Sequence, residues 1–187
     1  MSHEQLWAPW RIGYIRGELE KEAPAENRPL NFLPDADPQC FLCQCVADTA
    51  NDHRRGVVLR GGCGITVLNR YPYNNGHLLV APRRHVGRLD ELLAEEQLEL
   101  SQTLAQMVAL LEKVIQPQGF NVGLNLGRAA GAGLPGHLHW HVVPRWIGDT
   151  NFMPMLANVN VIPQSLEALW ELLTQALSGS YTANGQK

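Results

Sequence analysis

Three histidines, His137, His139 and His141, occupy alternate positions of the run GHLHWHVVPRW (136–146). Side chains two residues apart lie on the same face of a β-strand, but they do not face the same way on a helix. The spacing therefore predicts a strand over 137–143 that carries three imidazoles on one face. Three imidazoles on one face are too polar for a hydrophobic core unless they have a function. The run therefore indicates a functional site.

An imidazole can act as the nucleophile toward a phosphorus centre. A neutral ring nitrogen forms a covalent phosphoramidate with a phosphoryl or nucleotidyl group, and a second group protonates the leaving oxygen. His139 has a histidine on either side of it to orient it and to supply that proton. The alternative is a metal-binding strand that uses two or three of the histidines, as zinc sites often do. The loop before the histidines favours the catalytic interpretation.

That loop, GRAAGAGLPG (127–136), is rich in glycine and alanine. Glycine lets the backbone approach a ligand closely, and successive backbone amides form concave sites for phosphate. Such a loop is ordinarily a turn. This one, with Gly131 and Gly133 at its centre, lies between Asn125 and the histidines, and it therefore predicts an anion site beside His139.

The cysteines form a second group of candidate ligands. Cys40 and Cys43, in the run CFLC, have the spacing of a two-ligand zinc knuckle, although such a pair can also be a redox pair or incidental. Cys45 and Cys63 are interpreted as bystanders. The N-terminus lacks the apolar core of a signal peptide, so we expect a cytoplasmic, reducing setting, in which clustered cysteines bind metal more often than they form disulfides.

The apolar pattern predicts the elements that must position these residues. Besides 137–143, strands are expected at 57–60, 65–69, 77–82 and 120–126. A long amphipathic helix is expected at about 92–115, with Asp90 as its cap, and a second one at about 165–177. The sequence therefore predicts one α+β domain.

Composition divides the chain into three parts. Prolines interrupt residues 1–37, which we interpret as an irregular extension that packs on the body through its aromatic residues. Residues 38–150 form the predicted domain. Residues 151–187 form a second extension, with one helix and a frayed tail.

Charge and hydropathy exclude some classes of partner. The formal net charge of -3 gives no electrostatic case for nucleic acid or an anionic membrane as the partner. No apolar run approaches the ~20 residues of a membrane span. Local positive charge for a phosphate ligand is still available near the candidate site, from Arg83, Arg84, Arg128 and Arg145.

The histidine run resembles the motif of the histidine triad (HIT) family, His-φ-His-φ-His-φ-φ, in which φ is apolar. The run HLHWHVV (137–143) matches this motif at every position. The segments LNRYPYNNGHLLVAPRRHV (68–86) and NVGLNLG (121–127) are also similar to the family, and the resemblance covers about residues 38–150. The runs LWAPWRIGYI and GDTNFMP resemble the branch that includes bacterial diadenosine tetraphosphate phosphorylases and hydrolases.

The resemblance implies a HIT fold, with an antiparallel sheet, a long packed helix and a C-terminal helix, in a homodimer or a higher symmetric oligomer. It implies that His139 attacks the α-phosphate of a nucleotide and that His141 contacts this phosphate and the bridging oxygen. It also implies that Asn69 binds the ribose hydroxyls, and that His77 and Asn125 lie near the nucleotide and its phosphate.

A zinc-bearing branch of the family completes the cysteine pair with two histidines. The resemblance implies that His85 and His137 join Cys40 and Cys43 around one structural zinc per chain. His137 would then orient the triad and leave His139 free to react.

The chain departs from the family in one respect. Many members carry Gly-Gln-Ser or Gly-Gln-Thr before the triad, and the hydroxyl binds phosphate or the leaving group. Here the run is GAGLPG (131–136), without a hydroxyl. Phosphate binding must then rest on backbone amides, with Gly131 and Gly133 among them.

The implied reaction is nucleotidyl transfer from an adenine nucleotide derivative, above all a dinucleoside polyphosphate such as diadenosine tetraphosphate. The nucleotidyl-histidine is discharged to water by a hydrolase or to phosphate by a phosphorylase, and the triad does not choose between them. Two alternatives stay open: a nucleoside phosphoramidase, and a zinc-stabilised nucleotide-binding module with little turnover.

Overall fold

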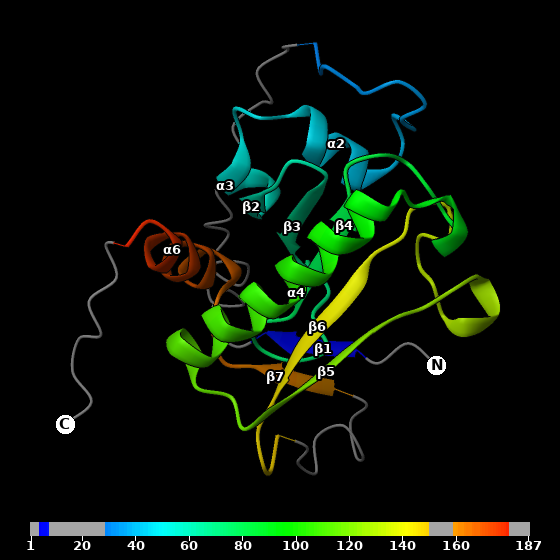
Figure 1. The fold of residues 1–187 in the computed structure, drawn as a ribbon. Helices are drawn as coiled ribbons and strands as arrows, with labels where there is room; N and C mark the ends of the chain where they lie inside the picture. The colour runs from blue at the N-terminus through cyan, green and yellow to red at the C-terminus, as the bar shows by residue number, and fades with distance from the viewer. Residues whose placement is uncertain (1–3, 8–28, 150–158, 180–187) are drawn as a thin grey trace.

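A five-stranded antiparallel sheet forms the centre of the structure (Figure 1). The computed structural model describes residues 4–7, 29–149 and 159–179. The strand order is β2-β3-β4-β6-β5. The strands are β2 (Val57–Arg60), β3 (Gly64–Leu68), β4 (Leu78–Pro82), β5 (Gly119–Leu124) and β6 (Trp140–Arg145). Four lie close to their predicted ranges, β6 begins three residues later than predicted, and the predicted α+β class is confirmed.

The long helix α4 (Ala94–Ile115) packs across one face of the sheet, as Figure 1 shows. Its apolar residues recur at helical spacing, so Leu100, Met107 and Leu111 are all buried against the sheet. Helix α6 (Leu166–Leu177) joins the same core, and the Ser165 hydroxyl caps it by accepting from the backbone N–H of Ala168 at 3.2 Å. No helix within the described ranges is long and apolar enough to cross a membrane.

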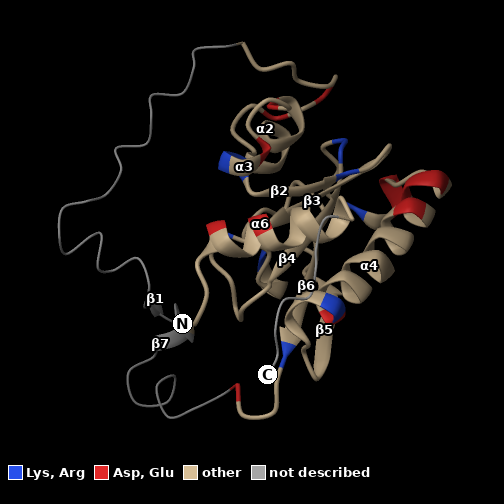
Figure 2. Cartoon of the chain, turned by 90° about the vertical axis from the view of Figure 1, so that its left-hand side faces the viewer, with Lys and Arg blue, Asp and Glu red and all other residues tan. Residues whose placement is uncertain are grey.

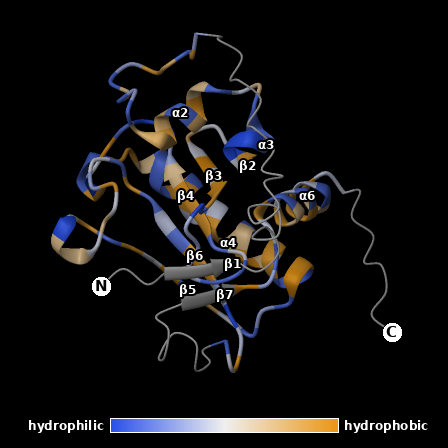
Figure 3. Cartoon of the chain, turned by 180° about the vertical axis from the view of Figure 1, so that it is seen from behind, coloured by the Kyte–Doolittle hydropathy of each residue, from blue (hydrophilic) through white to orange (hydrophobic). Residues whose placement is uncertain are grey.

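The opposite face of the sheet is covered by the segment that holds the cysteines. Helix α2 (Phe41–Ala47) buries Leu42 and Cys45 against β3 and β4, and the short helix α3 (Asp52–Arg55) follows it. Residues of β4 alternate between the two cores, and all five are buried. Figure 3 shows the apolar residues gathered on β3 and β4.

Acidic residues gather at the start of α4, as Figure 2 shows, and they complement the positive end of the helix dipole there. The predicted cap of this helix is wrong. Asp90 lies in the preceding turn η1 (Leu89–Glu91) and pairs with Arg88, whereas Leu93 is the cap residue and its N–H donates to Glu96. The carboxylate of Asp90 therefore pairs with the guanidinium of Arg88 and does not cap α4.

A second, two-stranded sheet joins distant parts of the chain. Strand β1 (Glu4–Trp7) pairs in parallel with β7 (Val159–Ile162). The prediction that residues 1–37 are irregular is therefore wrong at this strand, because a pairing between distant segments leaves no local pattern. Trp10 and Tyr14 of the N-terminal extension, and residues 180–187 of the predicted tail, lie outside the described residues.

A histidine centre and a cysteine–histidine cluster as the candidate active site

Three histidines meet where β4 and β6 pair. His77 immediately precedes β4, His139 immediately precedes β6, and His141 lies in β6 opposite Leu79 of β4. His77 Nε2 lies 2.9 Å from His141 Nδ1, and the ring centroids of His139 and His141 are 5.1 Å apart. His77 and His139 are buried. The structure therefore brings together three of the predicted site residues.

Hydrogen bonds determine which nitrogen of each ring carries the proton. The backbone N–H of Tyr73 donates to His77 Nδ1 at 3.0 Å, so this nitrogen has no proton. The proton of His77 is then on Nε2, which donates to His141 Nδ1. The proton of neutral His141 must therefore be on its Nε2. Within the described residues this Nε2 is buried and has no hydrogen-bond partner.

The ring of His139 is oriented by the backbone. Its Nδ1 lies 2.8 Å from the carbonyl oxygen of His137, and since a carbonyl only accepts, Nδ1–H is the donor. The lone pair of neutral His139 is then on Nε2. This is the tautomer that a nucleophilic imidazole requires, because the attacking nitrogen is free of a proton before the reaction.

Burial keeps the neighbouring imidazoles neutral. Burial, together with the neighbouring histidines, lowers the pKa of His77 to about 3 and that of His141 to about 4. Both rings are therefore uncharged near pH 7, as the assigned tautomers require. A neutral His141 can donate a hydrogen bond through Nε2 only.

Asn69 connects the histidine centre to a pocket. It follows β3, and its Oδ1 accepts from the backbone N–H of Tyr71 at 2.9 Å, which fixes the amide orientation. Its Nδ2 then lies 3.2 Å from His77 Nδ1. The pocket beside it has a volume of about 280 Å³, and its lining includes Phe41, Gln44, Cys45, Arg55 and Tyr71. These pocket residues were not predicted.

The glycine-rich loop folds back toward Asn125. Gly127 and Gly131 adopt φ values of 77° and 88°, which favour glycine, and a Cβ on Gly131 would lie 3.9 Å from Asn125 Nδ2. A Cβ on Gly133 would meet nothing within 4 Å. The loop is mostly exposed, and its part in phosphate binding stays a prediction. Arg145, one of the candidate cations, is paired with Asp149 at 2.6 Å.

Two cysteines and two histidines form a separate cluster. The Sγ atom of Cys40 lies 3.3 Å from His137 Nδ1, and that of Cys43 lies 3.3 Å from His85 Nδ1 and 3.6 Å from His137 Nδ1. All four ligand atoms lie within 4.8 Å of one another. A tetrahedral zinc with bonds of about 2.3 Å to sulfur and about 2.0 Å to nitrogen separates these atoms by about 3.5 Å. The cluster therefore has the size of a zinc site.

The surroundings of the cluster also fit a metal. His137 Nε2–H donates to the carbonyl oxygen of Pro82 at 2.8 Å, which leaves Nδ1 free to bind. Burial raises the pKa of the Cys40 thiol to about 11, so a thiolate there needs a cation beside it. Cys45 and Cys63 lie outside the cluster.

The structure corrects the prediction for the histidine strand. Strand β6 begins at Trp140 and not at His137. The segment before it is held differently, because the N–H of Leu138 donates to the Val86 carbonyl and the ring of His137 reaches the cysteines. The three histidines therefore do not act as one strand face: His137 belongs to the cluster, and His139 and His141 belong to the histidine centre.

An antiparallel sheet with one long helix across it and a His-x-His-x-His segment at its centre defines the HIT class of fold. The HIT domain model matches residues 57–146. The AP-4-A phosphorylase of Mycobacterium tuberculosis is 41% identical over 170 residues, which cover 91% of this chain and 82% of that protein. The chain belongs to the histidine triad family.

Other similar proteins are more distant. The asymmetrical bis(5'-nucleosyl)-tetraphosphatase of Schizosaccharomyces pombe is 36% identical over 93 residues, half of each chain. The crystal structure of a Zn-bound histidine triad family protein from Mycobacterium smegmatis matches with a TM-score of 0.61 and 25% identity, over 75% of this chain and 94% of that one. Plasmodium falciparum diadenosine triphosphate hydrolase shares the fold, with a TM-score of 0.56 over 92% of this chain and 99% of that one, at 16% identity.

Proposed function

We propose that the protein is a nucleotidyl hydrolase or transferase that cleaves the α-phosphate linkage of adenine nucleotide derivatives, in particular of dinucleoside polyphosphates such as diadenosine tetraphosphate. The observation that carries the proposal is the buried Nε2 of His141, which has no partner among the described residues, beside the oriented ring of His139. A buried donor without a partner is unusual, and a substrate oxygen would complete it. The names of the 41% identical phosphorylase and of the tetraphosphatase support the substrate class.

In the first step, His139 Nε2 attacks the α-phosphorus. A P–N bond forms while the bond from phosphorus to the bridging oxygen breaks, and His141 Nε2–H donates a hydrogen bond to that oxygen and stabilises the negative charge that develops on it. The leaving group departs, and for diadenosine tetraphosphate it is ATP. His77 holds His141 by the bond to Nδ1 and so keeps the hydrogen-bonding proton on Nε2.

In the second step, the nucleotidyl group passes from His139 to an acceptor. Hydrogen phosphate attacks through an oxygen that carries no proton, whereas an attacking water releases its proton to solvent. The P–N bond breaks and restores the neutral His139. Water yields AMP, and phosphate yields ADP.

The pocket beside Asn69 would hold the nucleoside. Asn69 lines the pocket and contacts His77, so a ribose bound to its amide would place the phosphate toward the histidine centre. We assign the phosphates to backbone amides of the loop that contains Gly131 and Gly133, together with Asn125.

The products from diadenosine tetraphosphate, with and without added phosphate, test the proposal. Attack at the α-phosphorus gives ATP and AMP without phosphate, and ATP and ADP from phosphorolysis. ADP as the sole product would contradict attack at this phosphorus. No products at all would favour the nucleotide-binding module, and faster turnover of a nucleoside phosphoramidate would favour the phosphoramidase.

We also propose one structural zinc per chain, held by Cys40, Cys43, His85 and His137. The distances within the cluster support it, as does the Zn-bound relative from M. smegmatis. Bound there, zinc would supply a fixed charge that stabilises both thiolates. Since four protein ligands leave no open position, these residues serve to hold α2 against the sheet and to orient His137.

The edge of the sheet and the free cysteines support a proposal for the assembly and the location. Strand β5 is an edge of the sheet, and Val122 within it and Leu126 just after it are 48% and 47% exposed. Such an edge invites pairing with a second copy, so we propose a homodimer joined along β5. The four cysteines are free, which supports a location in the reducing cytoplasm.

A further inference from the structure

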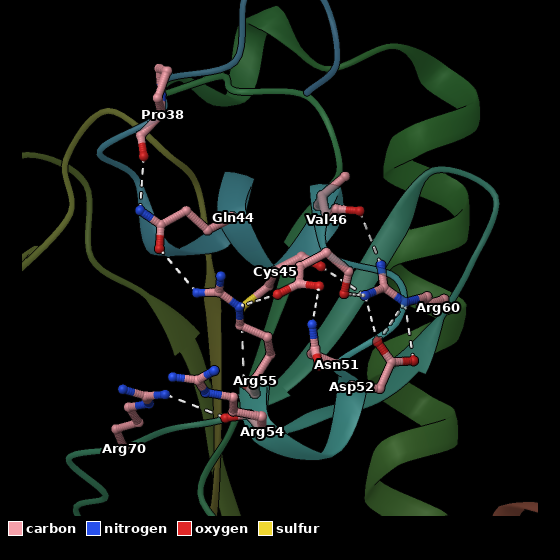
Figure 4. A network of polar contacts seen from close by, with 11 residues as sticks. Pro38, Gln44, Cys45, Val46, Asn51, Asp52, Arg54, Arg55, Arg60 and Arg70 are labelled. Atoms are coloured by element: carbon pink, nitrogen blue, oxygen red, sulfur yellow. Dashed lines mark hydrogen bonds and ion pairs between the residues drawn. The ribbon is translucent and has the colours of Figure 1, made fainter. Parts of the chain in front are cut away.

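Arg55 is held in the wall of the nucleoside pocket by two acceptors. Its Nε donates to Asp48 Oδ2 at 2.9 Å. Its Nη1 donates to Gln44 Oε1 at 3.1 Å, as Figure 4 shows. Asn51 in turn donates to Asp48 Oδ1 at 2.7 Å. Burial raises the pKa of Asp48, but the hydrogen bonds from Asn51 and Arg55 outweigh it and bring that pKa below its ordinary value. Arg55 is therefore positioned before any ligand arrives.

Gln44 is fixed in the same way. Its Nε2 donates to the carbonyl oxygen of Pro38 at 2.8 Å, so its Oε1 is the atom that faces Arg55 (Figure 4). Both side chains line the pocket. The pocket wall therefore contains a cationic donor and a carbonyl acceptor side by side.

A comparison with Arg60 separates this role from a structural one. The guanidinium of Arg60 donates to the carbonyl oxygens of Cys45, Val46 and Asp48 and to the carboxylate of Asp52, so it closes the end of α2. Arg55 uses only Nε and Nη1. Within the described part of the chain, its Nη2 has no acceptor, and its side chain is 25% exposed.

We propose that Arg55 and Gln44 read the base of the nucleotide and select adenine. Arg55 donates to N7 of the purine ring, and Gln44 Oε1 accepts from the exocyclic N6 amino group. Adenine presents this acceptor and this donor next to each other on one edge. A 6-oxo purine in the same position sets its oxygen against Gln44 Oε1, and a pyrimidine has no N7. The inference rests on the proposed function, and it names the residues that select the base.

The test compares ligands that differ by one atom or group. Calorimetry measures the affinity of the full-length protein for AMP, for 7-deaza-AMP, in which C–H replaces N7, and for inosine monophosphate, in which oxygen replaces the amino group. The wild-type protein binds AMP about tenfold or more tightly than either analogue, the effect of one hydrogen bond to a charged or fixed partner.

Two variants then assign each preference to its residue. In Arg55→Met, AMP and 7-deaza-AMP bind equally. In Gln44→Ala, AMP and inosine monophosphate bind equally. The matched control is Arg88→Met. Arg88 is exposed and does not line the pocket, so this variant keeps both wild-type preferences.

The outcomes separate this inference from the proposed function. Equal binding of AMP and 7-deaza-AMP by the wild-type protein overturns the inference, although AMP binding itself upholds the nucleotide site. A preference that persists in Arg55→Met also overturns it. Failure of the wild-type protein to bind any of the three nucleotides overturns both. The wild-type comparison needs no variant, so it decides even where Arg55→Met does not fold.

Discussion

The Nε2 atom of His77 lies 2.9 Å from Nδ1 of His141, and this bond joins residues 64 positions apart. The bond fixes the proton of His141 on its far nitrogen, Nε2, which is buried and unpartnered within the described residues. It also requires both rings to be neutral. The proposed hydrogen bond to the leaving oxygen depends on this single contact.

Acid should destabilise the protein partly through His77. Burial sets its pKa at about 3, below the ordinary value of about 6.5, so below pH 6.5 the unfolded chain binds a proton that the folded chain does not. The stability that neutral His77 contributes is complete above about pH 6.5, and it is lost as the pH falls toward 3. Between about pH 6 and pH 4, the free energy of unfolding should fall less steeply with decreasing pH in His77→Gln than in the wild type. The two slopes should differ by about 1.4 kcal/mol per pH unit. Urea unfolding of both proteins over this range checks it, and equal slopes would contradict it.

Asn69→Ala should weaken the binding of AMP. The loss of one amide that meets the ribose costs about 1–3 kcal/mol, because the buried hydroxyls lose their partner. We expect kcat to fall as well, since Asn69 Nδ2 lies 3.2 Å from His77 Nδ1. Calorimetry measures the affinity, with Asn121→Ala on the exposed strand β5 as the control. Unchanged affinity in Asn69→Ala would remove Asn69 from the ribose site.

His139→Ala should abolish turnover and spare binding. A covalent step has no substitute once the nucleophile is gone, whereas we assign the nucleoside and phosphate contacts to Asn69 and to the glycine-rich loop. We expect less than about a hundredth of wild-type kcat and an AMP affinity within about threefold of wild type. His53→Ala, at an exposed histidine, is the matched control and should keep full activity. Activity in His139→Ala above that limit would exclude the covalent mechanism.

Loss of the proposed zinc should affect stability more than chemistry. Cys40 and His137 are 97 residues apart, so a metal that joins them closes a long loop of the chain. We expect one zinc per chain by elemental analysis. We also expect Cys40→Ser to lower Tm by roughly 5–10 °C, with kcat of the folded protein nearly unchanged. Cys63→Ser, outside the cluster, is the control. Freshly purified protein without metal would refute the site.

Most of the fold could be predicted because its signals are local. The spacing of Leu100, Met107 and Leu111 marks α4, and the apolar run of β4 marks a strand buried on both faces. Strands β1 and β7 and helix α2 had no such signal. The pairing of β1 with β7 depends on distant segments, and α2 has only seven residues, so its stability comes from packing and not from propensity.

The candidate site could be predicted only as far as its motifs and the family resemblance reach. The motif indicates His139 and His141, and the cysteine spacing indicates Cys40 and Cys43. The histidine motif alone does not show that the ring of His137 points to the cysteines. Its alternating pattern is also that of an unbroken strand. The pocket residues Gln44 and Arg55 come together only through tertiary packing. The roles of the site residues, and the division at residues 37 and 150, stay predictions.

The nucleotidylated enzyme is the most direct test of the central claim. A reaction with diadenosine tetraphosphate is quenched within the first turnover and kept alkaline, because phosphoramidates hydrolyse in acid. Mass spectrometry of the digested protein should then find one adenylyl group on the peptide that contains His139, located on His139 itself. The adduct should still form, more slowly, in His141→Ala and be absent from His139→Ala. Release of ATP in the first turnover with no adduct, or an adduct on another residue, would contradict the proposed mechanism.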